Sequence, residues 1–374
     1  MKDDVILLAH GSGGKLSHDL VEGLFVRHFA NPTLLQLDDS AVVELRFPSS
    51  DPWPPASQLP APYRPAPRIA FSTDSYVISP LFFPGGDIGK LAVCGTVNDL
   101  SMSGAQALWL SAGFIIEEGL PMADLEQIVL SMAATARQAH VQIVTGDTKV
   151  VDWGSADKLF INTAGVGLVP AGLEIAGDRA RPGDAVLLSG TIGDHGMTIM
   201  TQREGLRFDS PLQSDCAPLN GLVAGLLAAL SSEPRSDAAR WALRPQDEGG
   251  VVRCLRDPTR GGLATALNEL ARRSNVGIEI EETAVPVREA VRGACELLGL
   301  DPLYVANEGK LIAVVAPEAA ETALATLRAH EYGRDAALIG YVTADHPGRV
   351  VLRTALEARR ILDMMVGEQL PRIC

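Results

Sequence analysis

The sequence predicts an α+β protein with two domains. Its 374 residues are too many for one ordinary hydrophobic core, because domains usually hold about 100 to 200 residues. Helical and strand-like patterns alternate along the chain. Prolines and glycines at residues 169–172 and 181–184 interrupt this alternation. We therefore expect an N-terminal domain over residues 1–168, a C-terminal α/β domain over 169–340 and a C-terminal segment over 341–374.

The clearest local pattern lies at residues 120–145. Pro121 stands where a helix can begin, and apolar residues follow it at helical spacing: Leu125, Ile128, Val129, Met132 and Ala136. A strand-like run follows at 141–144. The same patterns predict helices near 262–273, 286–298 and 317–330, and strands at 69–72, 159–168, 185–189, 310–315 and 336–342.

Two stretches are predicted to be loops. Eight prolines occur among the twenty residues 48–67, which can sustain neither a helix nor an inner strand. Residues 231–249 are polar and loop-like. We expect the proline-rich stretch to be a long exposed connection between two strands.

Composition and charge exclude several classes of protein. Hydrophobic residues make up 47% of the chain and charged residues 21%, which is typical of a globular protein. The net charge of −14, with no basic run, argues against a nucleic-acid partner. The acidic start leads into only five apolar residues, and no apolar stretch is long enough to span a membrane. We therefore expect a cytoplasmic protein without a membrane segment.

A glycine-rich stretch, residues 10–15, follows the first apolar run. Backbone N–H groups at Gly11, Gly13 and Gly14 could cradle a phosphate. The spacing fits neither a P-loop nor the dinucleotide-binding pattern, because Leu16 stands where each requires another residue. A flexible terminal loop is an equally good interpretation.

Aspartates beside small residues at the ends of apolar runs form a more informative set. They occur at residues 38–40, 73–75, 98–99, 146–149 and 257–262. For any single aspartate a helix cap or a turn is the more common role. Five such places together indicate one acidic centre, at which aspartates from several strand ends would hold a magnesium nucleotide.

Three further segments contain candidate functional residues. Gly261 and Gly262 open a predicted helix, where free N–H groups suit either a phosphate or an ordinary helix start. Glu308 precedes a predicted strand and is either a general base or a solvent-exposed turn residue. His195 lies in a glycine-flanked turn, where a hydrogen bond within the turn is the usual role.

The last residue is one of five cysteines that are far apart in the chain and form no CxxC pair, which indicates free thiols. About one chain in 75 of this composition would end in cysteine by chance. Gly367 and Pro371 interrupt the residues before Cys374, which favours a mobile and accessible thiol. A prenylation box is excluded because it would place the cysteine four residues from the end.

Together these motifs resemble the hydrogenase maturation family HypE, within the superfamily of aminoimidazole ribonucleotide synthetase and selenophosphate synthetase. The likeness covers nearly the whole chain, through residues 9–14, 72–77, 82–100, 145–150, 193–196, 257–262 and 371–374. The terminal Pro-Arg-Ile-Cys distinguishes this family from its superfamily relatives. The proline-rich stretch 48–67 is longer than the family pattern leads us to expect.

The resemblance implies a homodimer in which the N-terminal domains bind ATP and pair their strands into a shared barrel. It implies a Mg²⁺ site at Asp39, Asp74, Asp99 and Asp257. The nucleotide would be bound by Gly11, Gly13, Gly14, Asp38, Asp147, Thr148, Gly261 and Gly262.

The implied activity is dehydration of a carbamoyl group on the Cys374 sulfur. A carbamoyltransferase, HypF, would supply that group, ATP would carry away its oxygen, and HypC and HypD would receive the cyanide for the iron of NiFe hydrogenase. Glu308 would be the base and Lys149 would steer the phosphate or the carbamoyl group. Two rivals remain: a superfamily kinase or synthetase acting on a free small molecule, and a nucleotide-binding scaffold without turnover.

Overall fold

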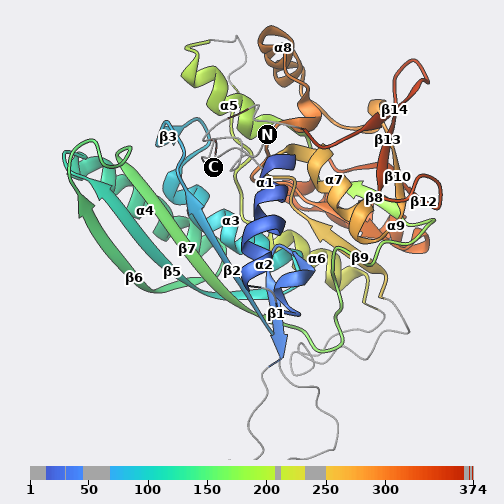
Figure 1. The fold of residues 1–374 in the computed structure, drawn as a ribbon, viewed down its shortest axis with the longest axis horizontal. Helices are drawn as coiled ribbons and strands as arrows, with labels where there is room; N and C mark the ends of the chain where they lie inside the picture. Colours follow the sequence, from blue (N-terminus) through green and yellow to red (C-terminus); the bar gives the residue numbers. More distant parts are fainter. Residues whose placement is uncertain are drawn as a thin grey trace, which may run out of the picture.

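A computed structural model describes residues 14–29, 31–44, 68–206, 212–231, 250–365, 370 and 373. Gly11, Gly13, Cys374 and the proline-rich stretch 48–67 lie outside the described residues. Two β-sheets, each covered by helices, lie side by side, with the helix α1 in front of the region between them (Figure 1). The predicted α+β class is confirmed.

The first sheet has the strand order β1-β2-β7-β5-β6. Its strands are β1 (Ala41–Glu44), β2 (Arg68–Tyr76), β5 (Gln106–Glu117), β6 (Gln142–Val151) and β7 (Leu159–Val169). All neighbours are antiparallel except β5 and β6, which are parallel and therefore need the crossover helix α4 (Met122–Gln138). That helix and α3 (Ile88–Met102) pack together on one face of the sheet.

The second sheet has the order β14-β13-β10-β12-β8-β11-β9. Its strands are β8 (Ala185–Leu188), β9 (Val252–Arg256), β10 (Gly277–Glu281), β11 (Ile312–Val315), β12 (Ala337–Thr343), β13 (Arg349–Arg353) and β14 (Arg359–Leu362). The inner strand β8 is buried on both faces. Val186 and Leu188 pack with α7 (Gly262–Arg273), while Ala185 and Leu187 pack with α6 (Asn220–Ala229) and α9 (Ala320–Ala329).

The remaining elements are short or lie around these layers. They are α1 (Lys15–Leu20), η2 (Val21–Val26), α2 (Arg27–Phe29), η3 (Leu34–Gln36), β3 (Phe82–Phe83), β4 (Gly86–Asp87), α5 (Asp194–Arg203), η6 (Glu282–Ala284), α8 (Glu289–Leu298), η7 (Pro302–Tyr304), η8 (Pro317–Ala319) and η9 (Glu331–Gly333). One core joins the two halves, because Met197 of α5, Val291 of α8 and the tail residue Ile373 belong to the same buried cluster as Leu91 of α3.

The predicted helix that begins at Pro121 and those near 262–273, 286–298 and 317–330 are confirmed, as are all six predicted strands. The sequence did not reveal α3, because apolar residues surround this helix and leave no one-sided periodicity. Cys94, Cys216, Cys254 and Cys295 are buried free thiols, as expected. Within the described ranges no helix combines the length and apolarity needed to cross a membrane.

Candidate functional site

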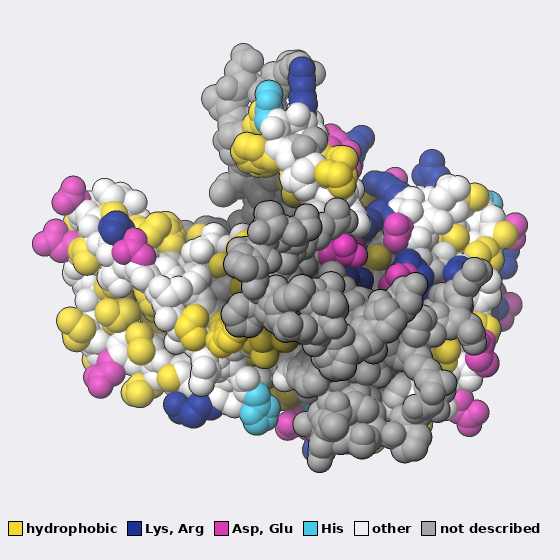
Figure 2. All heavy atoms as spheres, turned by 90° about the horizontal axis from the view of Figure 1, so that it is seen from below, with side chains coloured by type: hydrophobic (Ala, Val, Ile, Leu, Met, Phe, Trp, Pro, Cys, Tyr) yellow, Lys and Arg dark blue, Asp and Glu magenta, His cyan; other side chains and the backbone are white. Residues whose placement is uncertain are grey.

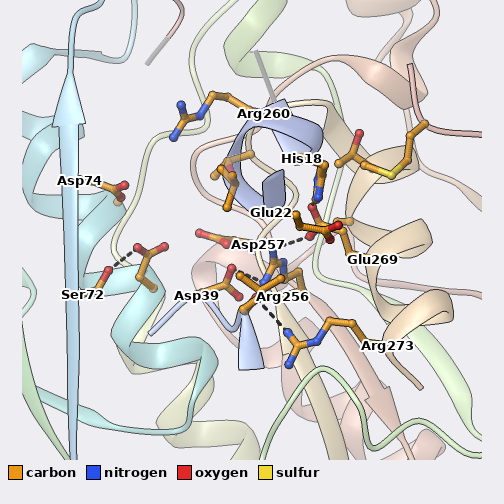
Figure 3. Close-up of a pocket in the computed structure, with 18 of the residues that line it drawn as sticks. His18, Glu22, Asp39, Ser72, Asp74, Arg256, Asp257, Arg260, Glu269 and Arg273 are labelled. Carbon is orange, nitrogen blue, oxygen red and sulfur yellow. Dashed lines mark hydrogen bonds and ion pairs between the residues drawn. The ribbon is translucent and has the colours of Figure 1, made fainter. Parts of the chain in front are cut away.

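A cavity of about 630 Å³ opens between β2, the start of α7 and the N-terminal helix α1. Four predicted aspartates line it: Asp39, Asp74, Asp99 and Asp257. They approach the cavity from both halves of the molecule, with Asp74 on β2 facing Asp39 and Asp257 across the open space (Figure 3). The predicted gathering of acidic side chains at one place is therefore present in the structure.

The elements that carry these aspartates are partly different from those expected. Asp39 precedes β1 and Asp257 follows β9, as the prediction of strand ends requires. Asp74 instead lies within β2, and Asp99 lies in the last turn of α3. Alternation along β2 turns Ser72, Asp74 and Tyr76 to the helix-covered face, and this orientation brings Asp74 to the cavity.

Asp39, Asp99 and Asp257 form a carboxylate centre, in which one oxygen from each lies within 4.8 Å of the others. Burial, followed by repulsion between neighbouring carboxylates, raises the pKa of Asp99 well above its usual value. Burial also raises the pKa of Asp257 to about 6, although Arg256 opposes the shift. Ser72 donates a hydrogen bond of 2.6 Å to Asp99.

The carboxylate centre fits a hard divalent cation. All its donors are carboxylate oxygens, which Mg²⁺ prefers. Asp257 Oδ2 is buried and has no hydrogen-bond partner among the described residues. A cation would supply the missing partner and offset the repulsion that raises these pKa values.

An arginine that the sequence did not single out braces this centre. The Arg256 guanidinium lies 2.6 Å from Asp39 Oδ1 and also bonds Glu269 of α7. His18 Nε2 of α1 lies 2.8 Å from Glu269 Oε1, so the N-terminal helix is tied to the same network (Figure 3). Asp38 does not line the cavity, but its carboxylate pairs with Arg273, which does, at 2.7 Å.

The segment before α7 borders the cavity through Thr259 and Arg260, and the first turn of this helix does so through Thr265. Gly261 caps this helix in a left-handed conformation, with φ of 75°. At Gly262 a Cβ would lie 2.7 Å from the backbone of Tyr304, so only glycine permits the close packing. These two glycines shape the helix start rather than lining the cavity. The positive end of the helix dipole at that start suits an anionic phosphate.

Glu308 lines the cavity and is only 3% exposed. The alternative of a solvent-exposed turn residue is thus excluded. Its backbone N–H donates to Asp215 Oδ1 at 3.1 Å, while its Oε1 is buried without a partner in the described part of the chain. Burial, followed by the nearby Cys216 and Asp257, raises the pKa of Glu308 well above its usual value. Such a carboxylate readily takes up a proton.

The other predicted residues lie away from this cavity or outside the described residues. Asp147, Thr148 and Lys149 are exposed on β6, where Lys149 Nζ lies 3.0 Å from Asp147 Oδ2. Gly14 is buried at the start of α1 but does not line the cavity, whereas Lys15 does. His195 does not line the cavity, and its Nε2 bonds the carbonyl of Ile373 rather than a group of its own turn.

Comparisons with known proteins cover the whole chain. Residues 38–169 and 181–353 match the family models for the N-terminal and C-terminal domains of AIR synthase related proteins. The chain is 52% identical over 374 residues to the carbamoyl dehydratase HypE of Azotobacter vinelandii, covering 100% of this chain and 98% of that relative. Its fold is similar to HypE in a solved HypE–HypF complex, with 46% identity, a TM-score of 0.78, and coverage of 92% and 99% of the two chains.

A solved structure of HypE in complex with ATP is 50% identical, with a TM-score of 0.74 and coverage of 99% of this chain and 100% of that one. Identity at this level over the full length is far above what a shared fold alone requires. The family resemblance found in the sequence motifs is therefore confirmed. The chain belongs to the HypE family of hydrogenase maturation proteins, built from the two domains of AIR synthase related proteins.

Proposed function

We propose that this protein dehydrates a carbamoyl group on the Cys374 sulfur to a thiocyanate at the expense of ATP. The observation that carries the proposal is the buried carboxylate of Glu308, which lines the same cavity as the carboxylate centre and whose Oε1 has no hydrogen-bond partner among the described residues. The curated names of relatives, carbamoyl dehydratase, and the solved HypE complex with ATP support it.

The reaction balances without any redox partner. The carbamoyl oxygen attacks the γ-phosphorus of ATP, and ADP leaves. The oxygen then departs as part of inorganic phosphate while the nitrogen loses both protons, so R–S–CO–NH₂ and ATP become R–S–CN, ADP and phosphate. Phosphorylation is needed because hydroxide is a very poor leaving group.

Residues of the cavity suit the parts of this reaction. Asp39, Asp74, Asp99 and Asp257 would hold Mg²⁺, which would neutralise the charge developing on the transferred phosphate. The N–H groups at the start of α7 would face the phosphates of ATP. The glycine-rich stretch that contains Gly11, Gly13 and Gly14 would contribute further backbone contacts.

Glu308 is the base in this proposal. Its burial keeps water from competing for the carboxylate, and its raised pKa makes it a better proton acceptor than an exposed glutamate. The unpartnered Oε1 is available to accept a proton from the carbamoyl nitrogen.

A homodimer with a shared barrel is part of the same proposal. The outer strand β6 is exposed along nearly its whole length, and β1 covers only residues 68–71 of β2, which leaves the edge of residues 72–76 open within the described chain. Phe71, Trp109 and Ile115 are 45–49% exposed on the face away from the helices. Figure 2 shows hydrophobic side chains gathered on this part of the surface.

Closing the two open edges would bury these apolar side chains and lay β6 of each copy beside β2 of the other. Lys149 would thereby come close to the partner's cavity, which residues 72–76 border. This arrangement gives Lys149 its proposed role in steering phosphate or the carbamoyl group, since in its own chain it lies outside the cavity.

The proposal assigns HypF as the carbamoyl donor and HypC with HypD as the cyanide acceptors, in the cytoplasm. A relative of this chain has been solved in complex with HypF. The thiol of Cys374 must visit each of these partners as well as the cavity. Mobility of the tail is therefore required, although Leu370 and Ile373 occupy buried positions in this structure.

The test is mass spectrometry of the C-terminal peptide after incubation with the carbamoyltransferase, carbamoyl phosphate and ATP. We expect Cys374 first to gain a carbamoyl group and then to lose one water, with release of one phosphate. Carbamoylation without later loss of water would overturn the proposal. Turnover of a diffusible substrate by a variant lacking Cys374 would favour a small-molecule kinase instead.

A further inference from the structure

His195 joins the C-terminal tail to the body of the protein. It lies at the start of α5 and its side chain is fully buried. His195 Nε2 is 2.6 Å from the carbonyl oxygen of Ile373, and Nδ1 is 2.7 Å from Ser214 Oγ. Ile373 directly precedes Cys374, so this contact is one residue from the thiol that the proposed reaction modifies.

The direction of these hydrogen bonds follows from the groups involved. A carbonyl oxygen only accepts, so Nε2 must carry a proton and donate it to Ile373. Burial lowers the pKa of His195, which favours the neutral ring. Nδ1 then accepts from the Ser214 hydroxyl, whose oxygen in turn accepts the Cys216 N–H at 3.1 Å. Ser214 thus fixes both the orientation and the tautomer of the histidine.

The next residue, Gly196, makes room for the tail. A Cβ at Gly196 would lie 3.0 Å from Leu370 Cδ1 and 2.6 Å from Val305 Cγ1. Leu370 is 8% exposed and Ile373 is 4% exposed, so two apolar side chains of the tail are seated in the core. The site that holds the tail therefore has space for the Leu370 side chain beside Gly196 and a hydrogen bond from His195 to the carbonyl of Ile373.

The loop at residues 212–219 connects His195, which holds the tail, to Glu308, the proposed base. Its Ser214 orients His195, while the carboxylate of the adjacent Asp215 accepts the Glu308 N–H at 3.1 Å. Asn98 of α3 donates to the carbonyls of Ala217 and Glu308, at 3.1 and 3.3 Å. A single short loop thus sets the position of the tail relative to Glu308.

We propose that His195 is a positioning residue, which latches the carbonyl of Ile373 and so presents Cys374 to the dehydration site. This inference rests on the proposed function. It gives the tail a defined bound position, from which the tail must be released to meet the partner proteins. Carbamoylation by the transferase takes place on the released tail, whereas dehydration requires the latch. Loss of the latch should therefore slow dehydration without slowing carbamoylation.

The test compares His195→Phe with His195→Gln. Phenylalanine keeps a ring against Phe83, whose ring lies 5.5 Å from that of His195, but it removes the donor. The amide nitrogen of glutamine can replace Nε2. In single-turnover assays on carbamoylated protein, we expect His195→Phe to dehydrate about tenfold or more slowly and His195→Gln to recover much of the rate. Carbamoylation of His195→Phe should be unchanged or faster.

A second measurement does not depend on the reaction. We expect carboxypeptidase to remove Cys374 faster from His195→Phe than from wild type, with His28→Phe, the same exchange at an exposed residue, matching wild type. Equal trimming of wild type and His195→Phe would overturn the latch, as would parallel loss of carbamoylation and dehydration. If the wild type itself never dehydrates, the proposed function fails, and the trimming rates still decide whether the latch exists.

Discussion

Two aspartates in similar sequence settings have opposite surroundings. Asp74, between Thr73 and Ser75, faces the cavity, where it raises the pKa of its neighbour Asp99. Asp147, between Gly146 and Thr148, is exposed on the edge strand β6, and Lys149 lowers its pKa. Within one chain, the predicted aspartates of the carboxylate centre lie at the cavity, whereas the predicted site residues on β6 lie outside it. In the proposed dimer, a second copy would supply β6 to the cavity.

The largest effect is expected at the cavity. Asp257→Asn removes a negative charge from the carboxylate centre, so we expect dehydration to slow by about 10²- to 10³-fold while carbamoylation of Cys374 persists. The matched control is Asp335→Asn, the same exchange at an exposed residue of the second half. Loss of carbamoylation as well would indicate misfolding instead of a missing metal ligand.

Mixed dimers test whether β6 acts on the partner's cavity. Lys149→Met and Asp257→Asn should each be inactive alone. Because one site of each mixed dimer would combine an intact cavity with an intact partner lysine, a 1:1 mixture should regain about a quarter of wild-type activity. The measurement is phosphate release after subunit exchange. A mixture as inactive as its components would mean that Lys149 acts within its own chain.

The sequence could predict the parts of the site that depend on local pattern. Asp74 and Asp257 stand beside small residues in strands or at strand ends, and the start of α7 is marked by its two glycines. The bracing of the centre by Arg256, Glu269 and His18 could not be predicted, because His18 lies far in the chain from the other two residues. Nothing in their local pattern separates these residues from ordinary surface charges.

The local sequence pattern also could not predict which polar residues are buried. The sequence leaves two interpretations of Glu308 open, because its burial does not follow from the residues next to it in the chain. His195 looked like a turn residue because its partner, Ile373, lies 178 positions away. Helix α3 was missed for the related reason that burial on all sides removes the periodicity on which helix prediction depends.

A substitution on the outer face of the first sheet should have a smaller effect, on dimerisation. Trp109→Glu would place a charge within the proposed barrel, so we expect dimerisation to weaken by about 2 kcal/mol or more, roughly a 30-fold rise in Kd. Leu356→Glu is the control, since Leu356 is 91% exposed in the second half of the chain. Sedimentation over a range of concentrations measures both variants. Unchanged association of the Trp109 variant would exclude this face as the interface.

The smallest expected effect is a change of stability with pH, and its sign differs between His195, which holds the tail, and Asp257 of the cavity. Burial depresses the pKa of His195 below its unfolded value of 6.5, while Asp215 opposes the shift and Arg203 adds to it. The neutral histidine therefore contributes stability that is fully present above pH 6.5 and is lost as the pH falls through the folded pKa. Asp257 behaves oppositely, because its pKa is raised from 3.8 to about 6 and its contribution is lost as the pH rises through that value.

Both groups titrate in overlapping pH ranges, so the wild-type stability curve alone does not separate them. Subtracting the free energy of unfolding of His195→Phe at each pH removes the carboxylate contribution, which both proteins share. We expect the wild type to lose stability relative to His195→Phe on acidification below pH 6.5, measured by urea unfolding. A difference that is independent of pH would mean that His195 is protonated equally in the folded and unfolded chain, and the neutral tautomer assigned to the latch would then be wrong.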